Sequence, residues 1–246
     1  MLRKLFIHYS SILLISLFTI KNNAYSQVVE SKTQFGGQFK PILPNRFIGE
    51  YIKPFQSELN TSFTGSVQQK FGYSAGFIIR HKFSNIFTVE SGINFVKRNY
   101  HFNYALIDSG IVAESNVSFI SYDIPINGLV YVRIAEQWYM NASAGINFNF
   151  YPTSVNSQNE DFFNDHLFRQ ITSPRRRVQL GLNINYGFDY RIKDVGTFYL
   201  GASYLLPFSD IAVHQMSWIY KGSDLRVREN VNGSYFTLDF KYFFPQ

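Results

Sequence analysis

Cysteine is absent from the 246-residue chain, and no long apolar run occurs after its first 26 residues. The first absence excludes disulfide bonds, a cysteine nucleophile and lipid attachment at an N-terminal cysteine. The second excludes a membrane-spanning helix in the remaining chain, because such a helix needs about 20 mostly apolar residues. Any anchoring in a membrane must therefore come from another kind of structure.

Residues 1–26 have the composition of a secretory signal peptide. Arg3 and Lys4 precede an apolar stretch at 5–20, and the small residues Ala24 and Ser26 stand where a signal peptidase cleaves. Polar residues interrupt the stretch, which is already short for a membrane span. We therefore predict cleavage rather than an uncleaved anchor, with residues 27–246 forming one domain.

A strong charge of either sign is also missing. The formal net charge is +6, but Arg3, Lys4 and Lys21 of the predicted signal supply three of the 23 basic residues, against 17 acidic ones. The small excess that remains gives no support for a nucleic-acid partner. Aromatic residues, by contrast, reach 18%, while the mean hydropathy of −0.11 resembles that of a soluble protein. This combination is typical of outer-membrane barrels, whose alternating strands hide apolar surface from window averages.

The stretch 178–192, VQLGLNINYGFDYRI, alternates apolar and polar residues without a break. Period-2 alternation indicates a β-strand. The stretch also exceeds the about 9–11 residues that a tilted strand needs to cross a bilayer. In a soluble sandwich its polar face would meet water, whereas in a membrane barrel its apolar face would meet lipid. The neighbouring strands must decide between these two folds.

Seven further stretches alternate similarly, which gives eight predicted strands: 33–44, 67–82, 86–104, 116–134, 138–151, 178–192, 197–208 and 234–244. Their connections are in turn long, short, long, short, long, short and long. Transmembrane barrels have long outer loops and short periplasmic turns, whereas a soluble sandwich has no reason to sort its loops this way. We therefore predict an all-β fold, an eight-stranded antiparallel up-and-down transmembrane β-barrel, with residues 27–246 as one outer-membrane β-barrel domain. The long connections should be loops at 45–66, 105–115, 152–177 and 209–233, of which the first is polar and irregular.

The strand at 86–104 changes phase. Its apolar residues fall on odd positions such as Phe87 and Phe95, and then on even positions from Tyr100 to Tyr104. One inserted residue would cause such a change, so we predict a β-bulge near Lys97.

Four stretches resemble the PorT-like outer-membrane β-barrel proteins: FGGQFKP at 35–41, GYSAGFIIRHKF at 72–83, VESGINFVKR at 89–98 and YDIPINGLVYVR at 122–133. The resemblance covers nearly the whole mature chain and implies an eight-stranded barrel in the outer membrane of a Gram-negative cell. One departure is that Phe244 is followed by Pro245 and Gln246, whereas such barrels usually end on an aromatic residue. The namesake of the family serves a protein-secretion system, but the resemblance implies little about function here.

Ten charged residues fall on the predicted inward faces: Lys40, Arg80, Glu90, Arg98, Asp123, Arg133, Asp189, Arg191, Asp239 and Lys241. The interior of a barrel of about eight strands is just wide enough for side chains to fill. Both signs occur in similar number, which suits mutual pairing away from water. We predict a packed ionic plug, with a polar pathway or ligand site as the alternative.

Histidines would be the first sign of an enzyme. We expect His81 near a periplasmic turn, His101 on the inward face near the loops, and His214 in a loop. Because no motif joins them to a serine and an acid, we predict no catalytic, cofactor or metal residue. A lipid-modifying barrel enzyme remains the alternative.

Two loop clusters have two readings each. Glu160, Asp161, Asp165 and His166 could hold a cation, although an amphipathic turn with Phe162, Phe163 and Leu167 on the barrel rim fits the pattern better. Arg175, Arg176 and Arg177 could contact lipid phosphates or form a solvated rim.

The function that these features favour is that of a monomeric outer-membrane barrel without catalytic activity. It would have a structural, binding or secretion-accessory role through its loops or periplasmic rim. Its partners would be outer-membrane lipid and other envelope or secretion proteins.

Overall fold

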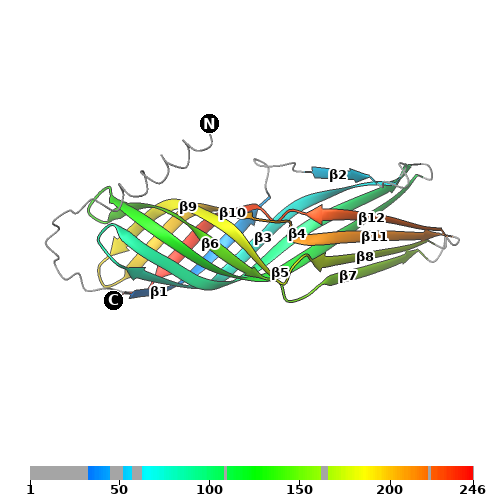
Figure 1. Ribbon diagram of the computed structural model, residues 1–246. Coiled ribbons are helices and arrows are strands. Elements are labelled where there is room, and N and C mark those ends of the chain that lie inside the picture. The colour runs from blue at the N-terminus through cyan, green and yellow to red at the C-terminus, as the bar shows by residue number, and fades with distance from the viewer. Residues whose placement is uncertain are drawn as a thin grey trace, which may run out of the picture. The chain divides into compact units, whose positions relative to one another are not determined.

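The computed structural model describes residues 33–44, 52–56, 63–107, 110–161, 166–220 and 223–245. The predicted signal peptide lies outside these residues. The described chain forms thirteen β-strands, arranged in one nine-stranded and one four-stranded sheet (Figure 1). No helix in this part of the chain is long and apolar enough to span a membrane.

Eight strands of the larger sheet form a closed barrel, as predicted. They are β1 (Thr33–Leu43), β3 (Phe63–Lys82), β4 (Phe87–Leu106), β5 (Ile111–Arg133), β6 (Trp138–Phe150), β9 (Val178–Ile192), β10 (Gly196–Pro207) and β13 (Tyr235–Phe243). Their order is β1-β13-β10-β9-β6-β5-β4-β3, all pairings are antiparallel, and β1 also pairs with β3. Closure leaves no sheet edge with unpaired backbone groups, which the lipid core of a membrane requires.

Short turns join the strands at one end of the barrel. Between β3 and β4, the Ser84 hydroxyl accepts hydrogen bonds from the backbone N–H of Phe87 (2.9 Å) and of Ile86 (3.3 Å). Between β9 and β10, Asp194 (φ 61°) and Gly196 (φ 128°) adopt positive φ values. Glycine suits the second of these positions because a side chain there would be strained.

The outer face of the barrel is apolar and exposed. On β5, for example, Ile120, Ile124, Ile126, Val130 and Val132 all point outward. Large aromatic residues of the same face include Phe35, Phe77, Phe87, Trp138, Tyr186, Phe198, Phe240 and Phe244. A contiguous exposed apolar belt of this kind is rare on soluble proteins and marks a membrane-facing surface.

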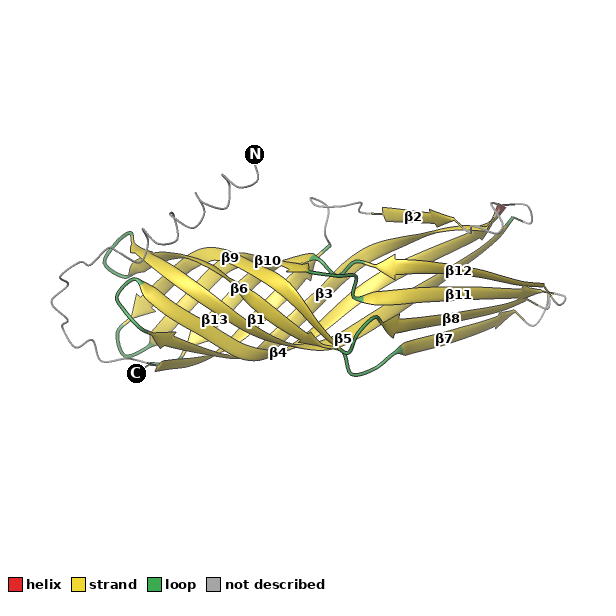
Figure 2. Cartoon of the chain, in the orientation of Figure 1, coloured by secondary structure: helices red, strands yellow, loops and turns green. Residues whose placement is uncertain are grey.

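The long connections are not irregular loops, which corrects the sequence-based expectation. They contain β2 (Ile52–Gln56), β7 (Val155–Asp161), β8 (His166–Pro174), β11 (Ala212–Tyr220) and β12 (Ser223–Val231). Four of them form the smaller sheet, in the order β12-β11-β8-β7, while β2 pairs with β3. Figure 2 shows these strands beyond the end of the barrel, beside the continuations of β3, β4 and β5.

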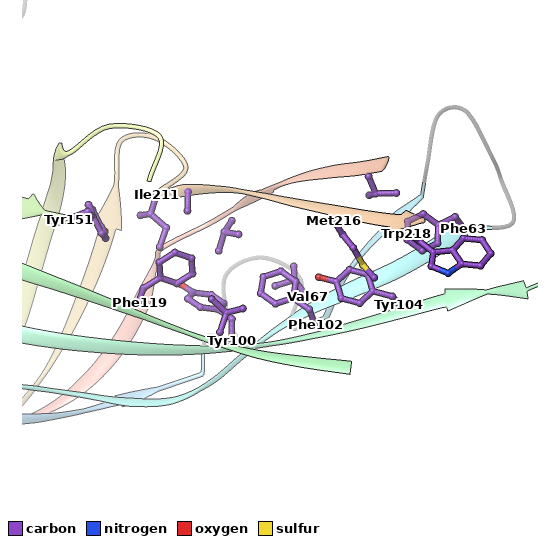
Figure 3. Packing of buried hydrophobic residues seen from close by; sticks show 14 of the residues in the cluster. Phe63, Val67, Tyr100, Phe102, Tyr104, Phe119, Tyr151, Ile211, Met216 and Trp218 are labelled. Atoms are coloured by element: carbon purple, nitrogen blue, oxygen red, sulfur yellow. The ribbon is translucent and has the colours of Figure 1, made fainter. Parts of the chain in front are cut away.

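We call this region the extension. It comprises the five additional strands together with residues 63–70 of β3, 99–106 of β4 and 111–119 of β5. Aromatic and aliphatic side chains from both sheets form its core (Figure 3), among them Phe63, Phe102, Tyr104, Met216 and Trp218. The extension therefore packs like a soluble β-sandwich, with an apolar interior between two sheets.

The phase change near Lys97 has a different cause from the predicted one. The even positions of β4 point inward along the whole strand, from Thr88 to Leu106, without a bulge. The register shift lies instead in the neighbouring strand β3, between Lys70 and Tyr73. What changes along β4 is the environment of the inward face, which is polar in the barrel and apolar in the extension.

Candidate functional site: the charged interior of the barrel

The interior of the barrel holds most of the charged residues that alternation places there. They fall into three groups along the barrel axis, each built around one or two buried carboxylates. Successive side chains of a strand point to opposite faces, and these charged residues are at the alternate positions that face inward.

The first group lies nearest the short turns and is centred on Arg80. Its guanidinium donates to Glu90 Oε2 (2.9 Å from Nη2) and to Asp189 Oδ2 (3.0 Å from Nη1). Lys241 Nζ lies 2.6 Å from the other oxygen of Glu90. The ring of Phe243 lies below Arg80, with its centroid 3.9 Å from Cζ. All four charged side chains are buried, so removal of one partner would leave an uncompensated charge.

The second group surrounds Asp239. Lys40 Nζ lies 3.1 Å from its Oδ2, and the amide of Asn185 donates to the same oxygen over 2.9 Å. The hydroxyls of Ser203 and Thr237 also donate to this carboxylate. Asp239 is fully buried, and these four donors replace the water that it would otherwise bind.

The third group lies at the junction with the extension. Arg98 donates to the Tyr151 hydroxyl (2.8 Å), and its Nη2 lies 3.7 Å from Asp123 Oδ2. Asp123 accepts hydrogen bonds from Ser121 (3.0 Å) and Asn147 (3.2 Å). A polar cavity of about 30 Å³ lies beside this group, which is room for one water molecule.

Glycines on the inward face make room for long side chains. A Cβ atom at Gly187 or at Gly201 would clash with the hydroxyl of Tyr199. That hydroxyl donates to Asn185 Oδ1 over 2.6 Å, and so links the neighbouring strands β10 and β9 at the second group.

Two of the ten predicted interior residues lie nearer the surface. Arg133 is exposed at the turn, where it donates to the carbonyl oxygens of Ala135 (3.3 Å) and Glu136 (3.2 Å), so its placement in the interior was wrong. Arg191 is about one-third exposed, lies 3.3 Å from Asp189 Oδ2 and stacks on Tyr139, 3.8 Å from the ring centroid. Both side chains are on the inward-facing side of their strands. They lie at strand ends, however, beyond the part of the barrel that side chains fill.

Polar neutral residues complete the network, and charge counting alone does not reveal them. They include Asn141, Asn147, Asn149, Asn185, Ser203 and Thr237, all buried. The same alternation that identifies the charged residues places these amides and hydroxyls inward, so their position was readable from the sequence. Their partners were not, because pairing depends on which strands face one another across the barrel.

His81, His101 and His214 each contact a different set of residues. His81 Nδ1 is 2.8 Å from the Thr33 hydroxyl near the short turns. His101 points outward, toward Asn116 and Glu114, which corrects its expected inward position. His214 is not in a loop but in the core of the extension. It stacks on Phe102 at 3.8 Å between ring centroids, with Nδ1 2.7 Å from the Thr172 hydroxyl.

Within the described residues, no group of three or more histidines, aspartates or glutamates is arranged to hold a metal ion. Glu160 and Asp161 belong to β7 and His166 and Leu167 to β8, so Leu167 lies in a strand and not in the predicted amphipathic turn. Asp165, Phe162 and Phe163 lie outside the described residues.

The three consecutive arginines connect β8 to β9 at the level where the outward faces change from apolar to polar. Arg175, Arg176 and Arg177 are all exposed, and Arg175 Nη1 lies 3.7 Å from Asp210. Val178, the next residue, is exposed on the apolar outer face of β9.

A family model described as outer membrane protein beta-barrel domain matches residues 26–213 of the chain. Among solved structures, the outer membrane protein OprG from Pseudomonas aeruginosa is similar, with a TM-score of 0.51 and 14% identity over 87% of this chain and 96% of that one. The beta domain of the Bordetella autotransporter BrkA has a TM-score of 0.23 and 8% identity, over 88% of this chain and 99% of that one. No curated protein matches the chain significantly.

Proposed function

The chain belongs to the outer membrane protein beta-barrel domain family, and from this premise we propose that it anchors an ordered binding module at the cell surface. The module is the extension. Short turns of outer-membrane barrels face the periplasm, so the extension at the opposite end projects outward from the cell. The continuity of β3, β4 and β5 from the barrel into the extension supports this proposal most directly.

The extension is suited to binding because it is a rigid surface with its own core. Phe102 and Tyr104 on β4 are buried in one core with Met216 on β11, while the alternate residues Asn99 and His101 are polar and point outward. Connections that merely close a barrel do not need such a core. A preorganised surface loses less entropy on binding than mobile loops do.

The barrel itself would act as an anchor rather than a channel or an enzyme. An ion crossing it would have to separate buried pairs such as Arg80–Glu90 and Lys40–Asp239, and breaking one buried pair costs about 3–5 kcal/mol. We expect rare, brief openings in planar-bilayer recordings of the refolded protein. A steady, large conductance would overturn the anchoring role and favour transport. A change in lipid A or phospholipid on overexpression would favour the alternative of a lipid-modifying enzyme.

The place of action can be tested with a photo-crosslinking residue at one of two positions. Arg228 is exposed on β12 of the extension, and Ser84 is exposed in a short turn. We expect crosslinks to a partner from position 228 and none from 84. Crosslinks from 84 alone would move the activity to the periplasmic rim and favour a secretion-accessory role.

We propose further that the exposed Arg175–Arg177 segment contacts the phosphates of outer-leaflet lipid. Its arginines stand beside the apolar belt, and guanidinium groups bind phosphate oxygens bidentately. Native mass spectrometry with lipid A should show fewer bound lipids for the double variant Arg176→Gln/Arg177→Gln. Arg228→Gln, which removes an exposed arginine of the extension, is the matched control. Equal lipid binding by both variants would leave these arginines as a solvated rim.

A further inference from the structure

A polar pocket opens at the mouth of the barrel, at the end with the short turns. Its volume is about 240 Å³, below the about 300–1,000 Å³ of pockets for drug-sized ligands. Three of its seven lining residues are cations, Arg80, Lys82 and Arg191, and none is a carboxylate. The pocket therefore suits a small ligand with negative charge.

Tyr131 gives the pocket a second feature that points to a ligand. Its hydroxyl oxygen is buried, yet it has no hydrogen-bond partner among the described residues. The guanidinium carbons of Arg191 and Arg80 lie 5.0 and 5.7 Å from the centroid of its ring. Buried polar groups are nearly always hydrogen-bonded. The Tyr131 hydroxyl is thus a donor without an acceptor, and it lies beside two cations. An acceptor oxygen at this point would have to come from a bound ligand.

The carboxylates nearby do not fill that place. Glu90 and Asp189 are both bonded to Arg80, and they lie in the buried group beneath the pocket. Arg191 shares Asp189 at 3.3 Å and keeps about one-third of its side chain exposed. Lys82, at the end of β3, is partly exposed. Donors from Tyr131, Lys82 and Arg191 therefore remain available at the pocket.

We propose that this pocket binds a small oxyanion, a carboxylate or phosphate group, presented from the periplasm. Charge-assisted hydrogen bonds to such a group are the strongest that these side chains can form. The oxyanion could belong to a small molecule or to the free chain end of a periplasmic peptide. This site is separate from the extension and adds a second, periplasmic contact to the anchoring role.

Calorimetric titration of the refolded full-length protein in detergent micelles tests the proposal. The probes are succinate, inorganic phosphate and the uncharged analogue succinamide. We expect binding of one or both anions and none of succinamide. Equal heats for succinate and succinamide, or no heat for either anion, would show that the pocket holds only water.

The variant Tyr131→Phe removes only the unpartnered hydroxyl, so the fold should be unaffected. We expect it to weaken anion binding about tenfold, the effect of one charge-assisted hydrogen bond. Tyr204→Phe is the matched control, because it removes another buried hydroxyl without a described partner, on β10. Unchanged affinity in Tyr131→Phe would overturn the proposal.

A short peptide with a free C-terminal carboxylate, compared with its C-terminal amide, distinguishes the two sources. Tighter binding of the acid than of succinate would assign the site to a peptide chain end. Weaker binding of the acid than of succinate would assign it to a free small molecule.

Discussion

The barrel and the extension are built partly from the same three strands, yet their insides and outsides are opposite in character. On β5, the inward residues of the extension include Val117 and Phe119, and those of the barrel include Asp123. The outward residues include Ser118 in the extension and Ile126 in the barrel. Alternation decides which residues share a face, whereas the surroundings decide which face must be apolar. Lipid surrounds the barrel, and water surrounds the extension.

The two regions should therefore be stabilised by different interactions. Closed backbone pairing and buried ion pairs stabilise the barrel. Its apolar outer face already contacts lipid, so burying that face in protein would bring no further stabilisation. Burial of aromatic side chains from water holds the extension, as in a soluble sandwich. Substitutions matched across the boundary can separate these contributions.

The largest effect is expected in the barrel interior, from Arg80→Met. Loss of the guanidinium leaves Glu90 and Asp189 buried with one cation fewer, which should cost about 3–5 kcal/mol of unfolding free energy. Urea unfolding of the protein refolded in vesicles measures this. Arg133→Met, at the exposed turn, is the control and should stay within about 0.5 kcal/mol of the parent. Equal losses in the two variants would mean that the ion pairs do not stabilise the barrel.

A similar loss, confined to the extension, is expected for Phe102→Ala. Phe102 is fully buried and stacks on His214, and truncation of such a residue costs about 3–5 kcal/mol. Limited proteolysis should cut the extension of the variant faster while the barrel stays intact. Glu114→Ala, on the outer face of β5, should be cut like the parent. Loss of the barrel together with the extension would show that the two regions unfold as one unit.

Much of this fold was predictable from the sequence because period-2 alternation is long in the barrel part of each of the eight strands. Alternation also placed Arg80, Glu90, Asp189 and Lys241 in the interior. Arg133 lies beyond the filled part of the barrel, at a strand end, where parity alone is not informative.

The extension was not predicted, and the reason is physical. Residues 152–177 and 209–233 are rich in polar residues, since their outer faces meet water on a sandwich only two sheets thick. Apolar residues that fill its core, such as Met216 and Trp218, are sparse in the sequence. Their role as core residues becomes clear only when the structure brings them together with Phe102 and Tyr104. For the same reason the change of chemistry along β4 resembled a bulge.

A third comparison introduces the same positive charge at two positions of β5, one in the barrel and one in the extension. Ile126→Arg puts a cation on the outward face near the middle of the apolar belt, which should cost about 2–4 kcal/mol. Ser118→Arg puts it on the same face of β5 in the extension, where water solvates it, with an effect within about 0.5 kcal/mol. Unfolding in vesicles measures both. Similar costs at 126 and 118 would mean that the membrane boundary lies elsewhere on β5.

The smallest effect is a pH dependence of the extension that His214 should cause. His214 is buried against Phe102, the Tyr104 hydroxyl and the Thr172 hydroxyl. Burial lowers the pKa of His214 to about 4, from an ordinary value of 6.5. The unfolded extension therefore binds more protons than the folded one between these values, and stability falls as the pH falls.

The contribution of neutral His214 is complete above pH about 6.5 and is lost progressively toward pH about 4. Between about pH 7 and pH 5, the extension should lose on the order of 2 kcal/mol. Amide hydrogen exchange of β8 and β11, followed across this range, measures the loss. His214→Gln should abolish the pH dependence, whereas His101→Gln, which changes the partly exposed histidine on the outer face, should preserve it. If His101→Gln removed the dependence instead, the outer face rather than the aromatic core would be the pH-sensitive part of the extension.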